Sequence, residues 1–209
     1  MTWRALPLLE TVLFVLVGMV WRAWLQVRRT GSTGIMLFRG GAVQALRDAG
    51  ILLLVTAFLA QAVAVLAGWL DAAPPSWAVV GTLLVVVGTT LMVMAQLDMG
   101  ASWRVGIDET SKPGLVTTRW YAFCRHPIYL FMFVVFAGLA LQLPTIFSAA
   151  LFAGLCVGVA WQVRYEEAFL ERTYGEEFRA YARRVGRFLP WIGRLTGGPS
   201  PAPGSALRA

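Results

Sequence analysis

Residues 127–163 carry no charged side chain, and this stretch constrains the fold more than any other feature of the chain. About 20 apolar residues are enough to cross the hydrocarbon core of a bilayer. The stretch is long enough to cross it twice. The segment Gln142-Leu143-Pro144-Thr145 lies near its middle, and proline is a strong turn signal. The sequence therefore predicts a helical hairpin of two membrane spans, residues 126–143 and 145–163.

Three earlier apolar runs, residues 6–25, 50–70 and 77–97, have the length of further spans. Of the 209 residues, 58% are hydrophobic and 14% are charged, whereas soluble domains carry roughly 25% charged residues. The predicted fold class is therefore all-α: a polytopic membrane helical protein with about five transmembrane helices and a C-terminal amphipathic helix.

The distribution of positive charge predicts the orientation of these spans. With five spans, the segments after the first and third runs share a side with the C-terminus, and of the 18 Lys and Arg residues only Arg4 falls on the opposite side. The positive-inside rule then places the N-terminus outside and the C-terminus in the cytoplasm. The net charge of +7 is assigned to orientation and lipid headgroups, with no nucleic acid as partner. Composition favours a bacterial inner membrane.

The segment after the fifth run, residues 166–185, has apolar residues at three- or four-residue spacing, as in an amphipathic helix. Gly175 is a possible break. Such a helix either lies in the headgroup region or covers a site between the spans. We divide the chain into an N-terminal part (1–97), a core (98–190) and a tail (191–209) whose residues 197–209 have a disordered composition.

Two polar clusters flank the predicted hairpin. Arg125-His126-Pro127-Ile128-Tyr129 opens it and holds the only histidine, while Arg164-Tyr165-Glu166-Glu167 follows its end. A hairpin brings both clusters to one membrane face. Taken singly, each residue is equally explained as an interfacial anchor or as an acidic residue in the first turn of a helix. The functional interpretation is favoured because the residues converge at one end of the hairpin.

Cys124 and Cys156 have no CxxC spacing and no second histidine nearby, so neither a metal site nor a disulfide framework is predicted.

The pattern around these clusters resembles the isoprenylcysteine carboxyl methyltransferase and phospholipid methyltransferase family. It covers about residues 96–190. The residues that carry the resemblance are Gly100-Ala101-Ser102-Trp103-Arg104-Val105-Gly106, Leu115-Val116-Thr117-Thr118, Tyr121, Arg125-His126-Pro127-x-Tyr129, Glu166-Glu167-x-x-Leu170-x-x-x-Tyr174-Gly175, Tyr181, Val185, Arg187 and Pro190.

The resemblance implies an integral membrane enzyme that uses S-adenosylmethionine without a Rossmann domain. The cofactor is then expected between the last two spans and the C-terminal segment. The implied cofactor-binding residues are Leu115, Val116, Tyr121, Arg125, His126, Pro127, Tyr129, Arg164, Glu166 and Glu167. Arg164 and Glu167 are the predicted catalytic residues: Arg164 pairs with the cofactor carboxylate, and Glu167 is the base if the acceptor is an amine or a hydroxyl.

The expected acceptor is a lipid, an isoprenoid, or a thiol or carboxylate on an apolar molecule, arriving sideways from the bilayer. The chain departs from the family pattern at Phe131, where a small residue is usual, and at Arg119-Trp120, where Gly-Pro is usual. If these positions line the cofactor cleft, Phe131 narrows it or redirects the acceptor. The alternatives are an NADPH-dependent membrane sterol or enone reductase and a non-catalytic membrane scaffold of the same fold.

Overall fold

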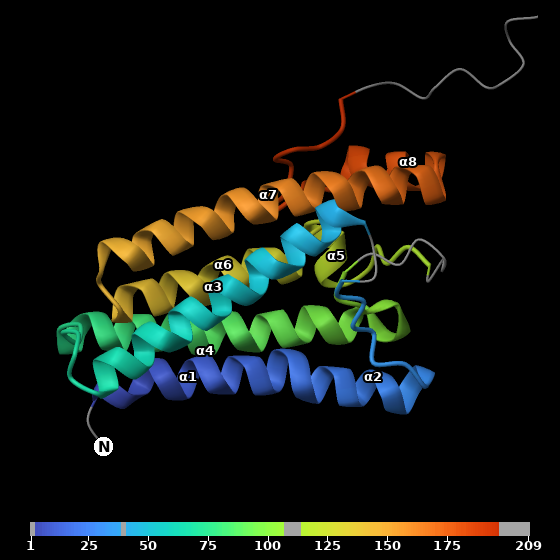
Figure 1. Ribbon diagram of the computed structural model, residues 1–209. Coiled ribbons are helices and arrows are strands. Elements are labelled where there is room, and N and C mark those ends of the chain that lie inside the picture. The colour runs from blue at the N-terminus through green and yellow to red at the C-terminus, as the bar shows by residue number, and fades with distance from the viewer. Residues whose placement is uncertain (1–2, 39–40, 107–113, 197–209) are drawn as a thin grey trace, which may run out of the picture.

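The computed structural model describes residues 3–38, 41–106 and 114–196, and these form a bundle of long helices (Figure 1). The first span runs from Trp3 to Thr30. It consists of η1 (Trp3–Ala5), α1 (Leu6–Val15), a π-helical segment η2 (Leu16–Trp21) and α2 (Arg22–Thr30). Gly31 ends it in a left-handed conformation, with φ 75°, which glycine adopts without steric cost.

The other spans are α3 (Ala42–Leu66), α4 (Pro75–Asp98), α6 (Pro127–Gln142) and α7 (Ile146–Tyr174). The predicted hairpin is confirmed, since α6 ends at Gln142. Thr145 then caps α7 by accepting a hydrogen bond from the Ser148 backbone N–H at 3.0 Å. Proline in the first turn starts both α4 and α6. The fold is therefore an all-α membrane bundle, as the apolar runs predict.

The helix α6 is shorter than its neighbours. Among the residues that the structure describes, four segments are long and apolar enough to cross a membrane, whereas α6 has 16 residues. At 1.5 Å per residue it is about 24 Å long, less than the ~30 Å hydrocarbon core. Residues that pack beside the first turns of α6 are therefore close to the hydrocarbon core of the bilayer.

The interface of α4 with α6 is made by glycines. A Cβ atom at Gly138 would lie 2.6 Å from the carbonyl oxygen of Gly81, and one at Gly88 would lie 3.1 Å from that of Phe131. Small residues let membrane helices approach until their backbones touch.

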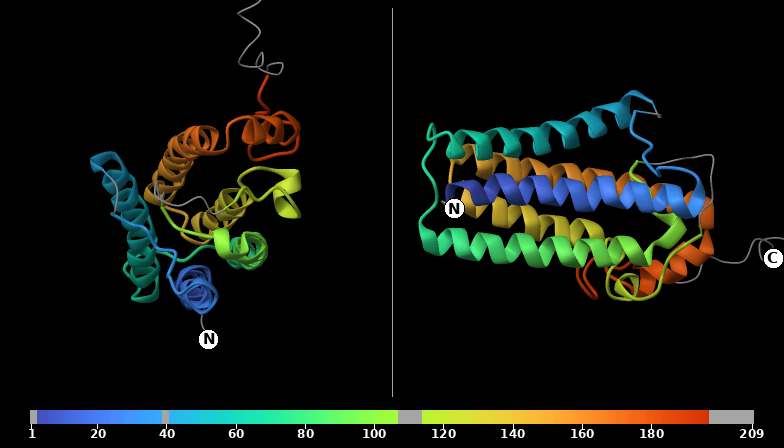
Figure 2. Two further views of the ribbon diagram at one scale, coloured as in Figure 1. Left: turned by 90° about the vertical axis from the view of Figure 1, so that its right-hand side faces the viewer. Right: turned by 90° about the horizontal axis from the view of Figure 1, so that it is seen from below.

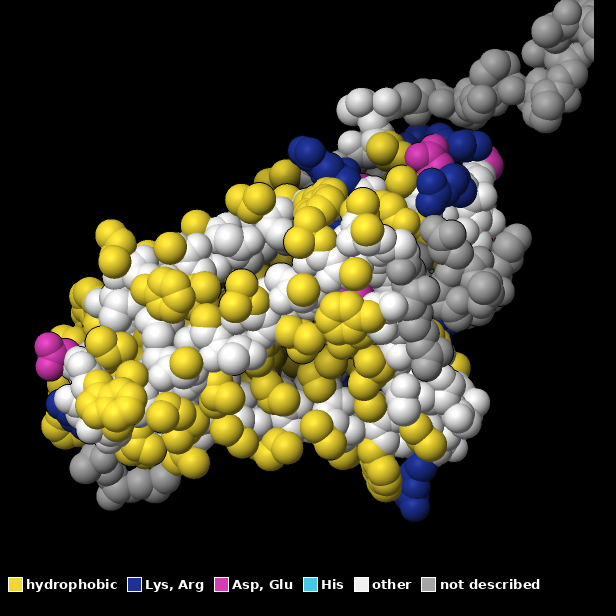
Figure 3. Space-filling view, in the orientation of Figure 1, with side chains coloured by type: hydrophobic (Ala, Val, Ile, Leu, Met, Phe, Trp, Pro, Cys, Tyr) yellow, Lys and Arg dark blue, Asp and Glu magenta, His cyan; other side chains and the backbone are white. Residues whose placement is uncertain are grey.

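Seen along the bundle, α4 lies between α1 and α6 (Figure 2). Apolar side chains cover the outer surface of the helices, and charged ones gather toward the ends (Figure 3).

A buried carboxylate joins three spans away from the polar clusters. Glu10 on α1 accepts hydrogen bonds from Thr82 Oγ1 on α4, at 2.7 Å, and from Gln142 Nε2 on α6, at 2.6 Å. Polar groups inside a membrane are costly unless they are satisfied. This network therefore fixes the relative position of α1, α4 and α6.

The predicted amphipathic segment 166–185 is helical up to Arg184 and is divided at Gly175, the possible break. Residues 166–174 continue α7, because no helix breaker occurs before Gly175. Gly175 reverses the chain with φ 55° and is followed by α8 (Glu176–Arg184). The apolar face of α8 packs on Leu115, Leu170 and Tyr174, so α8 covers the preceding segment instead of resting on lipid. The tail 197–209, predicted to be disordered, lies outside the described residues.

Candidate functional site

A short extended segment positions the first polar cluster. After α5 (Trp120–Phe123), Cys124 forms an isolated parallel bridge with Gly186. The backbone N–H of Arg125 donates to the Gly186 carbonyl at 2.9 Å, and that of His126 donates to the Arg187 carbonyl at 3.1 Å. The chain that follows α8 is thereby held against the start of α6.

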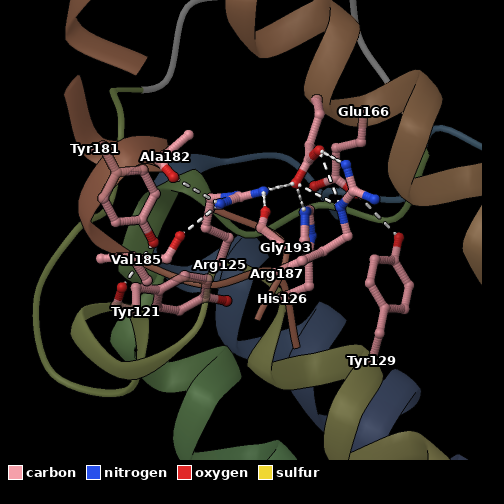
Figure 4. A network of polar contacts seen from close by, with 11 residues as sticks. Tyr121, Arg125, His126, Tyr129, Glu166, Tyr181, Ala182, Val185, Arg187 and Gly193 are labelled. Atoms are coloured by element: carbon pink, nitrogen blue, oxygen red, sulfur yellow. Dashed lines mark hydrogen bonds and ion pairs between the residues drawn. The ribbon is translucent and has the colours of Figure 1, made fainter. Parts of the chain in front are cut away.

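Glu167 on α7 lies at the centre of the site, and its partners Arg125, His126 and Arg187 are shown in Figure 4. Its Oε1 atom accepts from Arg125 Nε at 2.9 Å and lies 3.2 Å from His126 Nε2. Its Oε2 atom accepts from Arg187 Nη2 at 2.6 Å. Ion pairs of this kind are short and directional. The carboxylate therefore joins α7, the start of α6 and the segment after α8.

Arg125 is bound on every side. Its guanidinium donates to the carbonyl oxygens of Ala182, Val185 and Gly193, besides Glu167, and the residue is only 5% exposed. A buried cation with all of its donors satisfied holds the surrounding backbone in place. Arg125 is thus the structural centre of the C-terminal region.

The described part of the Glu167 cluster has more positive than negative charge. Two guanidinium groups, those of Arg125 and Arg187, share the single carboxylate of Glu167. The Arg187 side chain is 34% exposed, whereas that of Arg125 is 2% exposed. The excess positive charge is therefore accessible through Arg187. The His126 ring lies between the rings of Tyr129 (5.9 Å) and Phe188 (6.0 Å).

A second polar chain begins at Tyr129. Its hydroxyl donates to Glu166 Oε2 at 3.2 Å, and the Gln162 side chain lies beside that hydroxyl. Gln162 Oε1 in turn accepts from Arg47 Nη1 at 2.6 Å, and the Arg47 guanidinium stacks 4.1 Å from the Tyr165 ring. The start of α3 is thus connected to the site, although it lies far from it in sequence.

The remaining predicted residues have different environments. Leu115 packs in the apolar cluster of α8, Val116 is half-buried, and the Tyr121 carbonyl accepts from the Tyr181 hydroxyl at 2.7 Å. Burial raises the pKa of both tyrosines, and the nearby Glu166 raises that of Tyr121 further. Both phenols are therefore neutral at physiological pH.

Arg164 is not brought into the cluster. Its side chain is exposed on α7, and the guanidinium groups on Glu167 come from Arg125 and Arg187. Arg187 belongs to the family pattern without a predicted role, and the sequence predicts no role for Arg47 or Gln162. Hydrophobic periodicity cannot pair residues so far apart. In the sequence Arg47 lies just before the apolar run 50–70, which is also the usual position of an interfacial anchor.

Phe131 and Trp120, two of the residues that depart from the family pattern, pack together on the side of α6 opposite Tyr129. The Phe131 ring meets the Trp120 ring edge to face at 5.1 Å, with an interplanar angle of 83°. Two residues turn the helix by about 200°, so Phe131 and Tyr129 lie on opposite faces of α6. Phe131 is buried next to α4 and Trp120, away from the Tyr129–Glu166 pair.

Comparison with known proteins identifies relatives of this segment. Residues 77–177 match the phospholipid methyltransferase family. The chain is 36% identical over 110 residues to a nickel-cobalt-cadmium resistance protein of Alcaligenes xylosoxydans xylosoxydans, covering 51% of this chain and 50% of that protein. It is 31% identical over 128 residues to the protein-S-isoprenylcysteine O-methyltransferase of Rattus norvegicus, covering 59% and 42% respectively.

A third relative is a methanethiol S-methyltransferase of Bradyrhizobium diazoefficiens, 34% identical over 85 residues, with 40% of this chain and 28% of that protein covered. The chain thus spans about half, or less, of the length of these three curated relatives. The matched part contains α4, α6 and α7 with both polar clusters, whereas Arg47 and Arg187 lie outside residues 77–177.

Proposed function

We propose that the chain is an integral membrane methyltransferase of the family that its residues 77–177 match, the phospholipid methyltransferases. It moves a methyl group from S-adenosylmethionine to a lipophilic acceptor. The observation that carries this proposal is the convergence of Arg125, His126 and Tyr129 on Glu166 and Glu167. This convergence occurs inside the segment that matches the family.

The charges of the site fit the amino-acid end of such a cofactor, which has one carboxylate and one ammonium group. Arg187 provides an accessible positive charge beside His126. Glu166 provides a half-buried carboxylate whose described hydrogen bond is with Tyr129. We assign the cofactor carboxylate to Arg187 and its ammonium or ribose hydroxyls to Glu166. Arg164 remains a predicted cofactor contact at the exposed rim of the site.

We assign Glu167 a positioning role in place of the predicted role as a base. Its oxygens form ion pairs with the guanidinium groups of Arg125 and Arg187, so protonation of this carboxylate would cost both ion pairs. S-adenosylmethionine, when bound, supplies a methyl group already activated by its sulfonium. The chain then has to align the reactants and exclude water. Phe188 over His126 and the cover formed by α8 serve the second purpose.

The acceptor class is proposed from the surroundings of the site. The helices beside it expose apolar side chains to the membrane, so an apolar molecule can arrive by lateral diffusion. A lipid, an isoprenoid, or a thiol or carboxylate on an apolar body meets this requirement. We place the cluster on the cytoplasmic face of a bacterial inner membrane, with the N-terminus outside, because the arginines gather on that side.

Equilibrium binding to the purified protein in lipid nanodiscs tests the proposal, with S-adenosylmethionine, S-adenosylhomocysteine and NADPH as ligands. We expect the first two to bind and NADPH not to bind. Glu166→Gln and Tyr129→Phe should each weaken binding about tenfold, the equivalent of ~1.4 kcal/mol. Glu177→Gln, an exposed change on α8, serves as control. Binding of NADPH alone would indicate the reductase, and binding of none of the ligands would indicate the scaffold.

A further inference from the structure

The segment after α8 forms a compact loop with exposed apolar side chains. Leu189, Trp191 and Ile192 are 47%, 72% and 65% exposed. By contrast, Phe178, Tyr181 and Ala182 of the preceding helix are buried. Large apolar side chains gathered at the surface indicate an interaction site. The apolar surface of the C-terminal region is therefore on this loop and not on α8.

The loop has a specific conformation. The backbone N–H of Arg187 donates to the Ile192 carbonyl at 2.8 Å, and that of Leu195 donates to the Ala182 carbonyl at 3.0 Å. A Cβ atom at Gly186 would lie only 1.9 Å from the Leu189 carbonyl oxygen, so the turn requires glycine there. Trp191 itself has φ 67°, a strained conformation for a bulky residue. Strain of this kind persists only where the surroundings enforce it, and here it holds the indole outward.

The direction of the chain gives the depth of the loop. The bridge between Cys124 and Gly186 is parallel, so residues after Gly186 run the same way as residues that enter α6. Phe188 then contacts Phe133, with ring centroids 5.6 Å apart. Phe133 lies six residues beyond Pro127, about 9 Å into the span at 1.5 Å per residue. In Figure 1 the chain after α8 runs back along the bundle past the end of that helix.

Because α6 is short, a loop beside its first turns lies at the level of the lipid hydrocarbon. Because α6 is about 24 Å long, less than the ~30 Å core, its first turns lie in or at the edge of the hydrocarbon. The loop lies beside those turns. Tryptophan is favoured at the boundary between headgroups and hydrocarbon, and arginine extends to the headgroups. Arg184 and Arg194, both exposed, flank the loop on either side.

We propose that the loop Phe188-Leu189-Pro190-Trp191-Ile192 is inserted into the bilayer leaflet beside the start of α6. The bilayer itself is the partner of this surface. In the inserted loop, the Phe188 ring covers the lipid-facing side of His126. The loop also occupies the part of the hydrocarbon core that α6 is too short to span. This inference depends on membrane integration alone and not on methyl transfer.

Photolabelling of the unaltered protein tests whether the loop is inserted into the bilayer. Phospholipids with a diazirine near the first acyl carbons are reconstituted with the full chain, irradiated and mapped by mass spectrometry. Trypsin releases residues 188–194, which contain the loop, and residues 173–179, which contain the start of α8. We expect at least tenfold more lipid adduct on 188–194 than on 173–179. Equal labelling of the two peptides, or no labelling of 188–194, would overturn the proposal.

A second measurement does not depend on the photochemistry. A nitroxide is attached at Ile192→Cys or, as a matched control, at Glu177→Cys, in a background with Cys124→Ala and Cys156→Ala. Collision with oxygen should dominate at position 192, and collision with a water-soluble nickel chelate should dominate at position 177. Preferential access of the chelate to position 192 would contradict insertion. The melting temperature of each variant checks that the fold is intact.

Discussion

The Nη2 atom of Arg187 lies 2.6 Å from the Oε2 atom of Glu167, joining the segment after α8 to the end of the last span. Arg125 approaches the other oxygen of the same carboxylate. Replacement by the neutral isostere in Glu167→Gln leaves two guanidinium groups without a counter-ion. We expect a loss of about 3 kcal/mol of stability, the cost of breaking a buried pair. Thermal unfolding in detergent measures it.

The matched control for this change is Glu171→Gln, one turn further along α7. Glu171 forms an exposed ion pair with Arg179, which contributes at most about 1 kcal/mol. Equal melting temperatures for the two variants would contradict the central role of Glu167.

Arg119 has a backbone conformation that favours glycine. Its φ and ψ are 55° and −123°, nearly those of Gly175 at 55° and −121°. Arg119→Gly should therefore stabilise the protein by about 1 kcal/mol, since strain of this kind costs ~1–3 kcal/mol and the exposed pair with Asp98 adds little. Gly175→Ala should have the opposite effect. The free energy of unfolding measures both, and a destabilised Arg119→Gly would contradict the argument.

Cys124 should be inert toward alkylation in the folded protein. Burial raises the pKa of its thiol to about 11, against a lowering effect of the His126 backbone N–H. At pH 8 roughly one thiol in a thousand is then ionised, and only the thiolate reacts. In a Cys156→Ala variant, iodoacetamide should label Cys124 only after unfolding, as mass spectrometry can show. Rapid labelling of the native protein at pH 8 would contradict this environment.

Arg47, on α3, should affect ligand binding at the proposed cofactor site. Its Nη1 atom lies 2.6 Å from Gln162 Oε1, and the Gln162 side chain lies beside the Tyr129 hydroxyl. Arg47→Met keeps the apolar stem and removes the donor, so we expect about fivefold weaker binding of S-adenosylhomocysteine, the value of one hydrogen bond of ~1 kcal/mol. Arg28→Met, which removes a cation stacked on Trp24, is the control. Unchanged affinity in Arg47→Met would exclude the connection.

The contact between Phe131 and Trp120 could not be inferred from the sequence, although helix geometry alone places Phe131 opposite Tyr129. Phe131 lies two residues from Tyr129, which suggested a shared cleft. The ring instead packs on Trp120, because residues two apart in a helix point to opposite sides. The two unusual aromatic residues are partners of each other, and their contact is separate from the Tyr129–Glu166 pair.

The sequence by itself determined the membrane helices, the hairpin and the meeting of the two polar clusters. These follow from local properties: the length of uncharged runs, the breakers at Pro144 and Gly175, and the connection of α6 to α7 by a short turn. Only the tertiary structure decided which charges pair with Glu167, how α3 reaches Gln162, and that Phe188 after α8 contacts Phe133 in α6. Those contacts join residues far apart in sequence, and they depend on helix rotation and chain direction, which periodicity does not encode.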